Sequence, residues 1–229
     1  FFTVPISILL FILRAQVARI VWGSGKFDWT DTRLAAASLG VFSIGLCAQG
    51  LIFILSKTFY AAHNTKIPAI ISFVTVVFNI VMSFFFVWLL SLHGLFFAFF
   101  QFVLRLQGID NISVLGLPLA FSIAGIVEAL LLLFLLYKNF KVFRIKHMAV
   151  SLYKIALSGA LTAATAFLAR QIVVSYNLVN LQTFLGVFFQ LAFAASAGII
   201  CYIGMSFILQ SPELEMIKNS FLPKFFKKN

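Results

Sequence analysis

Six long runs of apolar residues constrain this chain more than any other feature of its sequence. A helix that crosses a bilayer needs about 20 mostly apolar residues. Runs of this kind cover residues 1–23, 34–55, 68–90, 113–137, 155–176 and 183–209. Hydrophobic residues make up 62% of the chain and charged residues 10%, against about 45–50% and about 25% in soluble domains. The sequence therefore predicts a polytopic membrane protein with six spans.

The pattern within the runs indicates helices. Backbone amides in lipid have no water to bond, so a span is either a helix or a strand of a closed barrel. Barrel strands alternate apolar and polar residues, and the runs show no such alternation. We therefore predict an all-α membrane helical bundle. The first run begins at Phe1 and meets Arg14 and Arg19 early, so we expect the chain to be the C-terminal part of a longer protein.

Basic residues are distributed unevenly between the two ends of such a bundle. One end carries eleven of them, in the region of Lys57 and Lys66, in the basic loop 138–154 and in the tail 210–229. The other end carries six, namely Arg14, Arg19, Lys26, Arg33, Arg105 and Arg170. The richer end is expected in the cytoplasm, together with the C-terminus. The basic loop is also a candidate for contact with anionic lipid headgroups.

The segment 91–112 allows two interpretations. Its Phe-rich centre, 95–107, has about 13 residues, which is too short to cross a bilayer. Gln101 and Arg105 lie four residues apart and therefore on one helical face, which favours a helix lying in the membrane interface. A seventh span is the alternative, and it would reverse the orientation of everything that follows.

Composition and spacing exclude several classes of function. The net charge of +11 does not indicate nucleic-acid binding, because the basic residues lie where membrane topology places them. Cys47 and Cys201 fall inside apolar runs and are predicted to be packing residues. The three histidines show no metal-ligand spacing, and no nucleophile, histidine and acid set is present. We predict a protein that is not an enzyme and carries no cofactor or metal.

Three stretches between and within the runs share a family pattern. They are GKFDWTDTR at 25–33, FYAAHNTKIP at 59–68 and GLPLAFSIAGIVEALLLLFLLYK at 116–138. Local roles explain each one separately: Asp31 suits the start of a helix, Asn64 and Thr65 a turn and a cap, and Pro68 a first helical turn. Their order along one chain is not explained by local roles.

This series resembles the MurJ (MviN) family of lipid II flippases. The matching residues are Gly25, Phe27, Asp31, Thr32, Phe59, Tyr60, Ala61, Thr65, Lys66, Pro68, Gly116, Leu117, Leu119, Ala120 and Ser122. The chain departs from the family pattern at Asn64, where aspartate is usual, at Ile67, where threonine is usual, and in a longer segment 91–112. The resemblance is strong over residues 5–137 and weaker over the last two runs.

The resemblance implies a MATE-like fold of the MOP superfamily, in which two lobes enclose a cavity and alternate access across the bilayer. It implies that this chain holds the last six of fourteen helices, with four helices of the second lobe in 1–137 and two appended helices in 155–209. The appended helices resemble those that form a lipid-tail groove in the family.

The resemblance also implies a partner and a location. The partner is lipid II, an undecaprenyl-pyrophosphate-linked muropeptide of cell-wall peptidoglycan biosynthesis, and the location is the bacterial cytoplasmic membrane. The arginines that bind the headgroup in the family lie in earlier helices, so no headgroup-binding residue is transferred to this chain.

Polar residues inside the apolar runs are candidate functional sites, because they are costly in lipid and often mark pathways. Glu128 is the one acid deep in a run, and it is either a coupling carboxylate for protons or cations or a protonated or paired acid that stabilises helix contacts. Asn79 and Ser122 are oxygen ligands for a weakly indicated sodium site, or interhelical hydrogen-bonding groups. Ser83 stands where a stronger carboxylate ligand is expected. The coupling ion, sodium or proton, stays open.

The sequence therefore predicts a fragment of a lipid II flippase that moves its substrate without covalent chemistry. A related polysaccharide-lipid flippase and a non-transporting membrane scaffold of the same fold are the alternatives. An integral-membrane enzyme acting on isoprenoid-linked substrates is disfavoured, because Glu128 stands alone where catalysis needs clustered acids or histidines. The oligomeric state stays open.

Overall fold

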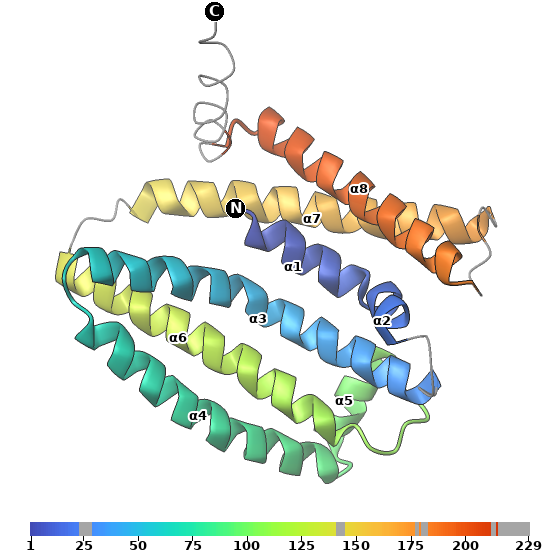
Figure 1. The fold of residues 1–229 in the computed structure, drawn as a ribbon, viewed down its shortest axis with the longest axis horizontal. Helices are drawn as coiled ribbons and strands as arrows, with labels where there is room; N and C mark the ends of the chain where they lie inside the picture. The colour runs from blue at the N-terminus through green and yellow to red at the C-terminus, as the bar shows by residue number, and fades with distance from the viewer. Residues whose placement is uncertain (23–28, 141–144, 177–178, 180–182, 212–213, 215–229) are drawn as a thin grey trace, which may run out of the picture.

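A computed structural model describes residues 1–22, 29–140, 145–176, 179, 183–211 and 214. The helices, in chain order, are α1 (Thr3–Ile12), α2 (Arg14–Trp22), α3 (Trp29–Ala61), α4 (Lys66–Ser91), α5 (Leu95–Leu104), the 3-10 turn η1 (Ser113–Leu115), α6 (Gly116–Phe140), α7 (Ile145–Ser175) and α8 (Phe184–Ile208) (Figure 1). Within the described residues the chain forms helices and no strand. The prediction of an all-α membrane helical bundle is confirmed.

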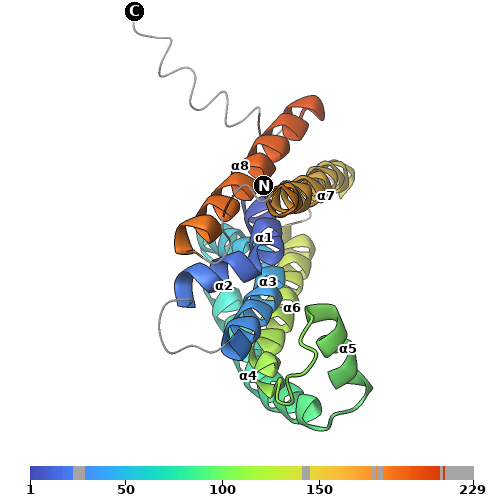
Figure 2. The same ribbon diagram turned by 90° about the vertical axis from the view of Figure 1, so that its right-hand side faces the viewer.

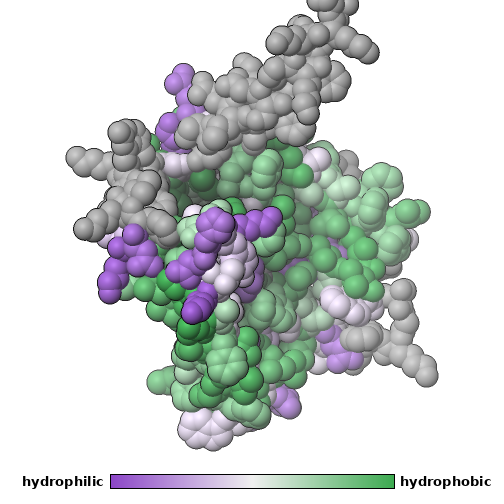
Figure 3. Space-filling model, turned by 60° about the vertical axis from the view of Figure 1, so that its left-hand side comes forward, coloured by the Kyte–Doolittle hydropathy of each residue, from purple (hydrophilic) through white to green (hydrophobic). Residues whose placement is uncertain are grey.

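Among the described residues, five helices are by themselves long and apolar enough to cross a membrane, and the bent pair α1 and α2 would make a sixth span if it crosses as one unit. The five are Thr30–Ala61, Lys66–Ser91, Ser113–Asn139, Val150–Ser175 and Phe184–Ile208. Most of their side chains are not covered by the rest of the chain; on α4, Phe73 and Phe84 are 72% and 76% exposed. Figure 3 shows hydrophobic side chains over most of the face in view, with hydrophilic ones gathered in small groups. Such a surface is stable in lipid and not in water.

The first predicted span, 1–23, is wrong as a single helix. Its residues form α1 and α2, whose axes are bent by 75° at a break between Ile12 and Arg14. The sequence changes at this point from an apolar run to RAQVARIVW, which holds two arginines and a glutamine. Gln16 Nε2 donates to Gln190 Oε1 on α8 over 3.3 Å. The bend therefore gives the polar side chains of α2 protein partners instead of lipid.

The predicted basic loop 138–154 is mostly helical, and its cytoplasmic position stays a prediction. Helix α6 continues to Phe140 and α7 already begins at Ile145, so residues 145–154 are helical. The stretch IKHMAVSLYK contains no glycine or proline, so nothing in it ends a helix. Lys141 and Arg144 lie outside the described residues, as does most of the tail 210–229.

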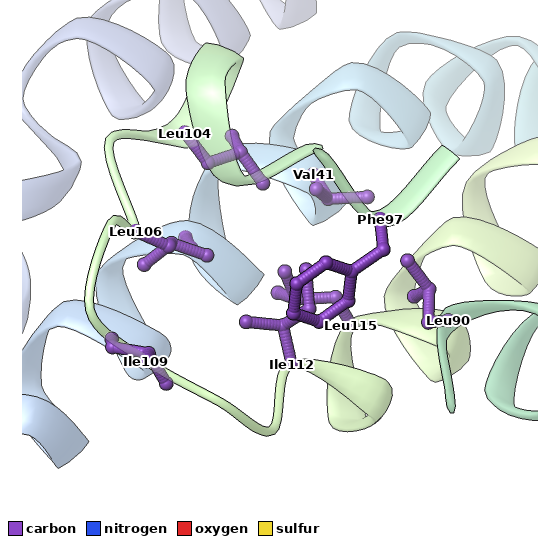
Figure 4. Close-up of a cluster of buried hydrophobic side chains, with 9 residues drawn as sticks. Val41, Leu90, Phe97, Leu104, Leu106, Ile109, Ile112 and Leu115 are labelled. Carbon is purple, nitrogen blue, oxygen red and sulfur yellow. The ribbon is translucent and has the colours of Figure 1, made fainter. Parts of the chain in front are cut away.

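Helix α5 is shorter than the predicted helix 95–107, because Arg105 ends it in a left-handed conformation (φ 56°, ψ 46°). The amide of Leu106 then donates to the carbonyl of Gln101 over 2.8 Å, which closes the helix end. The chain returns to the bundle through a buried apolar cluster (Figure 4). The cluster consists of Ala37, Val41, Leu90, Phe97, Leu104, Leu106, Ile109, Ile112 and Leu115. It fixes α5 and the following loop against α3; the interfacial position of α5 stays a prediction.

The helices pack in two groups with α1 between them. Helix α6 packs against both α3 and α4, and α7 packs against α8. Helix α1 contacts α3 on one side and α7 on the other, and α2 contacts α3 and α8 (Figures 1 and 2). Small residues allow the closest approaches: a Cβ added at Gly45 of α3 would lie 2.9 Å from Ser122 Cα of α6. This is the packing that lipid-embedded helices use, since lipid provides no hydrophobic force between them.

Candidate functional site

Glu128, the acid predicted as a coupling group, bridges two helices. Ser72 Oγ on α4 donates to Glu128 Oε1 on α6 over 2.6 Å, and both side chains are half-buried. A hydrogen bond of this kind satisfies a polar group that lipid would leave without a partner. This contact matches the second of the two interpretations of Glu128, in which it stabilises helix packing.

Asn79 and Ser122, the two residues of the weakly indicated sodium site, have different partners. Ser83 Oγ donates to Asn79 Oδ1 over 3.4 Å within α4. Ser122 is buried, and its Oγ donates to the carbonyl of Val41 over 2.8 Å, which joins α6 to α3. In the described part of the chain these two residues share no hydrogen bond. A sodium site on Asn79 and Ser122 stays a prediction.

The motif residues at 59–68 build the connection between α3 and α4. Phe59 is fully buried in a cluster with Leu55, Ile71, Leu132 and Leu136, whereas Tyr60 is half-exposed. The amide of Ile67 donates to Asn64 Oδ1 over 3.3 Å, so the asparagine caps α4.

Other motif residues lie at the ends of α3 and α4. Thr65 makes no side-chain cap, Lys66 begins the helix, and Pro68 is buried in its first turn. At the other end of α3, Asp31 lies in the first turn and Thr32 is buried. Gly25 and Phe27 lie outside the described residues.

A pocket that the sequence did not predict lies at the end of the bundle where α3 begins and α7 ends. Helices α2, the start of α3 and α5 meet at this end (Figure 1). The cavity measures about 390 Å³. Its lining consists of Phe11, Ile12, Arg14, Ala15, Arg19, Thr32, Arg33, Ala36, Ala37, Leu104, Arg105, Phe167 and Arg170. We call it the arginine pocket, because five of the six arginines of the chain line it.

Two of the arginines rest on aromatic rings. The guanidinium carbon of Arg14 lies 4.9 Å from the ring centroid of Phe11, and that of Arg170 lies 5.1 Å from the ring centroid of Phe167. A ring face attracts a guanidinium group and leaves the N–H edge of its plane available. Gly40 makes room for Arg14, since an added Cβ would lie 2.7 Å from its Cδ.

Two arginines of the pocket, Arg33 and Arg170, donate hydrogen bonds to backbone carbonyls. Arg33 Nη2 donates to the carbonyl of Arg105 and, over 3.3 Å, to that of Gln107. Arg170 Nη1 donates to the carbonyl of Ile12 over 3.3 Å. These bonds join α3 to the end of α5 and α7 to the end of α1. They therefore connect residues from distant parts of the chain around one cavity.

The pocket has a strong positive charge. None of the described residues that line it is acidic. Arg14 lies within electrostatic range of both Arg105 and Arg170. Like charges gathered at a partly buried site repel one another, and an anion placed among them relieves this repulsion. The sequence offered a signal, since Arg14, Arg19 and Arg170 interrupt apolar runs, but only the fold shows that they meet.

Comparison with known proteins agrees with the resemblance in the loop motifs. Residues 1–99 match the family model described as lipid II flippase MurJ. The chain is 23% identical to the probable lipid II flippase MurJ of Bdellovibrio bacteriovorus over 220 residues, which cover 96% of this chain and 36% of that protein. It is 29% identical to the lipid II flippase MurJ of Thermosipho africanus over 134 residues, which cover 58% of this chain and 24% of that protein.

A shorter match reaches higher identity. The chain is 32% identical to the probable lipid II flippase MurJ of Rhizobium tropici over 83 residues, which cover 36% of this chain and 16% of that protein. No solved structure matches the chain significantly. The chain thus spans about a third or less of the length of these curated relatives.

Proposed function

This chain is related to the MurJ family of lipid II flippases, and we propose that it supplies membrane helices of a flippase that moves lipid II from the cytoplasmic to the outer leaflet. The observation that carries the proposal is the match of residues 1–99 to the family model in a chain that folds as a polytopic helical bundle. Because the chain spans only part of its relatives, transport is proposed for the native protein and not for these 229 residues alone.

In the proposed mechanism, α1 to α6 move as a unit of one lobe in a transporter that alternates access. Rigid-body motion needs helices that stay packed during the movement. The close approach of α3 and α6 at Gly45 supports this, as does Gly116, where an added Cβ would lie 2.5 Å from the backbone nitrogen of Val87. Neither contact leaves room for one helix to slide past the other.

Helices α7 and α8 are proposed to contact the lipid tail of the substrate. Their outward residues are large and apolar: Phe189, Phe193 and Ile200 of α8 are 60%, 50% and 70% exposed. An isoprenoid tail needs only an apolar surface, so these side chains suit it without specific polar contacts.

The protein is proposed to lie in the bacterial cytoplasmic membrane with its C-terminus in the cytoplasm. Lys57, Lys66 and Lys138 lie at the end of the bundle where α3 ends and α4 begins, which we call the lysine end. Lys154 Nζ donates to the carbonyl of Gln210 over 3.1 Å, which places the residues following α8 near the same end. An excess of basic residues marks the cytoplasmic side.

Depletion of the native protein in its own cells tests the proposal. Outer-leaflet lipid II is measured by the reaction of its headgroup with a membrane-impermeant reagent, and total lipid II is measured in parallel to exclude a block in synthesis. We expect total lipid II to persist while its outer-leaflet fraction falls. Unchanged outward movement would overturn the proposal. Loss of another lipid-linked saccharide from the outer leaflet, with lipid II unaffected, would favour a related polysaccharide-lipid flippase.

A further inference from the structure

We propose that the arginine pocket is a binding site for a phosphate or diphosphate group, built by Arg14, Arg105 and Arg170 and closed by Arg19 and Arg33. The site lies within the chain itself, at the end of the bundle opposite the lysine end. Its existence does not depend on the transport of lipid II, since the chemistry that defines it is the charge and shape of this cavity.

The type of basic residue differs between the two ends of the bundle. Among the side chains that the structure describes, every arginine lines the pocket, and the lysines lie toward the lysine end. Membrane topology selects positive charge on the cytoplasmic side and treats lysine and arginine alike. It does not explain five arginines at the end with fewer basic residues. A ligand that needs guanidinium groups does explain them.

Guanidinium groups match the geometry of phosphate oxygens. The planar fork of an arginine donates two parallel hydrogen bonds to one phosphate, and the group keeps its charge in a partly buried site, whereas a lysine binds as a point charge. Phe11 and Phe167 hold the planes of Arg14 and Arg170 by their faces. In the described part of the chain, Arg14 donates no hydrogen bond, so its N–H groups are available to an anion.

Arg33 has a positioning role. Its Nη2 is occupied by the carbonyls of Arg105 and Gln107, and so it ties the end of α5 to the first turns of α3. Arg105 is thereby held in its left-handed conformation at the rim of the cavity. The buried cluster shown in Figure 4 includes Leu106 and Ile109 of the same loop.

Apart from the arginines and Thr32, the described residues that line the pocket are apolar. Ile12, Ala36, Ala37 and Leu104 contribute side chains without polar groups. The volume of about 390 Å³ falls in the range of about 300–1,000 Å³ typical of sites for organic ligands. A phosphate that carries an apolar or uncharged organic group fits this combination. Both a lipid headgroup in the outer leaflet and a free phosphate compound offer that chemistry.

Binding is tested on the purified protein by thermal unfolding, because a ligand that binds the folded state raises the unfolding temperature. Two probes separate the sources. Inorganic pyrophosphate is added to protein in neutral detergent, and protein is reconstituted in nanodiscs of phosphatidylcholine alone or of an equal mixture with phosphatidylglycerol. Arg14→Gln and Arg170→Gln remove pocket charges, whereas Lys57→Gln and Lys66→Gln remove charges at the lysine end as matched controls.

We expect the pocket variants to weaken the response by roughly tenfold or more in affinity, the usual worth of a hydrogen bond to a charged group, and the controls to keep it. A response to pyrophosphate that the pocket variants lose identifies a site for free phosphate compounds. A response to phosphatidylglycerol alone, lost in the same variants, identifies a lipid headgroup site. No response to either probe, or one that only the lysine variants reduce, overturns the proposal.

The ligand-free protein provides the control for folding. A purely structural Arg14 would lower the unfolding temperature of the Gln variant equally with and without the probe, and that result also overturns the proposal. If Arg14→Gln does not fold, Arg14→Lys keeps the charge and removes the bidentate fork. We then expect a folded protein with a weaker response, and an unchanged response would contradict the assigned geometry.

Discussion

Glu128 illustrates how one hydrogen bond changes the interpretation of a residue. An isolated acid in an apolar run indicates a functional site, but here the carboxylate accepts from Ser72 on the facing helix. A glutamine at this position keeps an acceptor oxygen for Ser72, whereas a leucine leaves the serine hydroxyl without its partner. The two substitutions therefore separate a packing role from a coupling role.

We predict that Glu128→Gln leaves stability and transport nearly unchanged, and that Glu128→Leu lowers the free energy of unfolding by about 1 kcal/mol. Thermal unfolding in detergent measures stability, and outer-leaflet lipid II measures transport in cells that depend on the variant. Loss of transport in a stable Glu128→Gln protein would instead assign the carboxylate to proton or cation coupling.

Arg33 is expected to stabilise the loop that follows α5, because it donates to two backbone carbonyls there. Arg33→Lys keeps the positive charge, but a lysine cannot reproduce the fork that bonds the carbonyls of Arg105 and Gln107. We predict a loss of about 1 kcal/mol in local stability, seen as faster hydrogen exchange at the amides of Leu106 and Ile109. Lys66→Arg, an exchange of exposed basic residues at the lysine end, is the control. Equal exchange in Arg33→Lys and the native protein would show that the buried cluster alone holds the loop.

At the scale of the helix, small residues decide how closely two elements pack. Gly45 on α3 and Gly204 on α8 are both helical glycines, but an added Cβ meets Ser122 at 2.9 Å in the first case and open space in the second. We predict that Gly45→Ala lowers the free energy of unfolding by about 1–3 kcal/mol, the usual cost of overpacking. Gly204→Ala is expected to leave it unchanged or raise it, because alanine favours a helix over glycine. Equal effects in thermal unfolding would mean that α3 and α6 adjust freely.

Helices were predictable from the sequence where lipid alone determines them, and less so where other parts of the chain do. The apolar runs at 34–55, 68–90 and 183–209 each lie within or close to an observed helix, because lipid requires an apolar helical stretch whatever its neighbours are. The helix that follows the bend at Leu13 contacts a residue far along the chain, Gln190, and no local pattern reveals such a contact.

The arginine pocket was not predicted either, because it also depends on contacts between residues far apart in the sequence. Its charges come from α2, α3, the end of α5 and α7, and only long-range packing brings Arg14 and Arg170 to one cavity. The sequence predicts the side of the membrane on which the arginines lie, but it does not predict that they line one cavity. Conversely, Asn79 and Ser122 looked like one site in the sequence, and their hydrogen bonds join different partners in the fold.

The whole molecule has two ends of different chemistry, and this difference predicts its orientation. Thr65 lies at the lysine end and Asp110 at the end that holds the arginine pocket, and both side chains are exposed. With the lysine end in the cytoplasm, a cysteine at position 110 is accessible from outside the cell and one at position 65 is not. The half-buried Cys47 and Cys201 are first replaced by alanine, so that each variant carries a single thiol.

We predict that Asp110→Cys reacts with a membrane-impermeant maleimide in intact cells, and that Thr65→Cys reacts only after the membrane is permeabilised. Labelling of both before permeabilisation would indicate damaged cells, which a cytoplasmic marker protein controls for. The reverse pattern would place the five arginines in the cytoplasm. Membrane topology would then account for their positive charge without a ligand. The orientation measurement therefore also tests whether the charge of the arginine pocket is evidence for a bound anion.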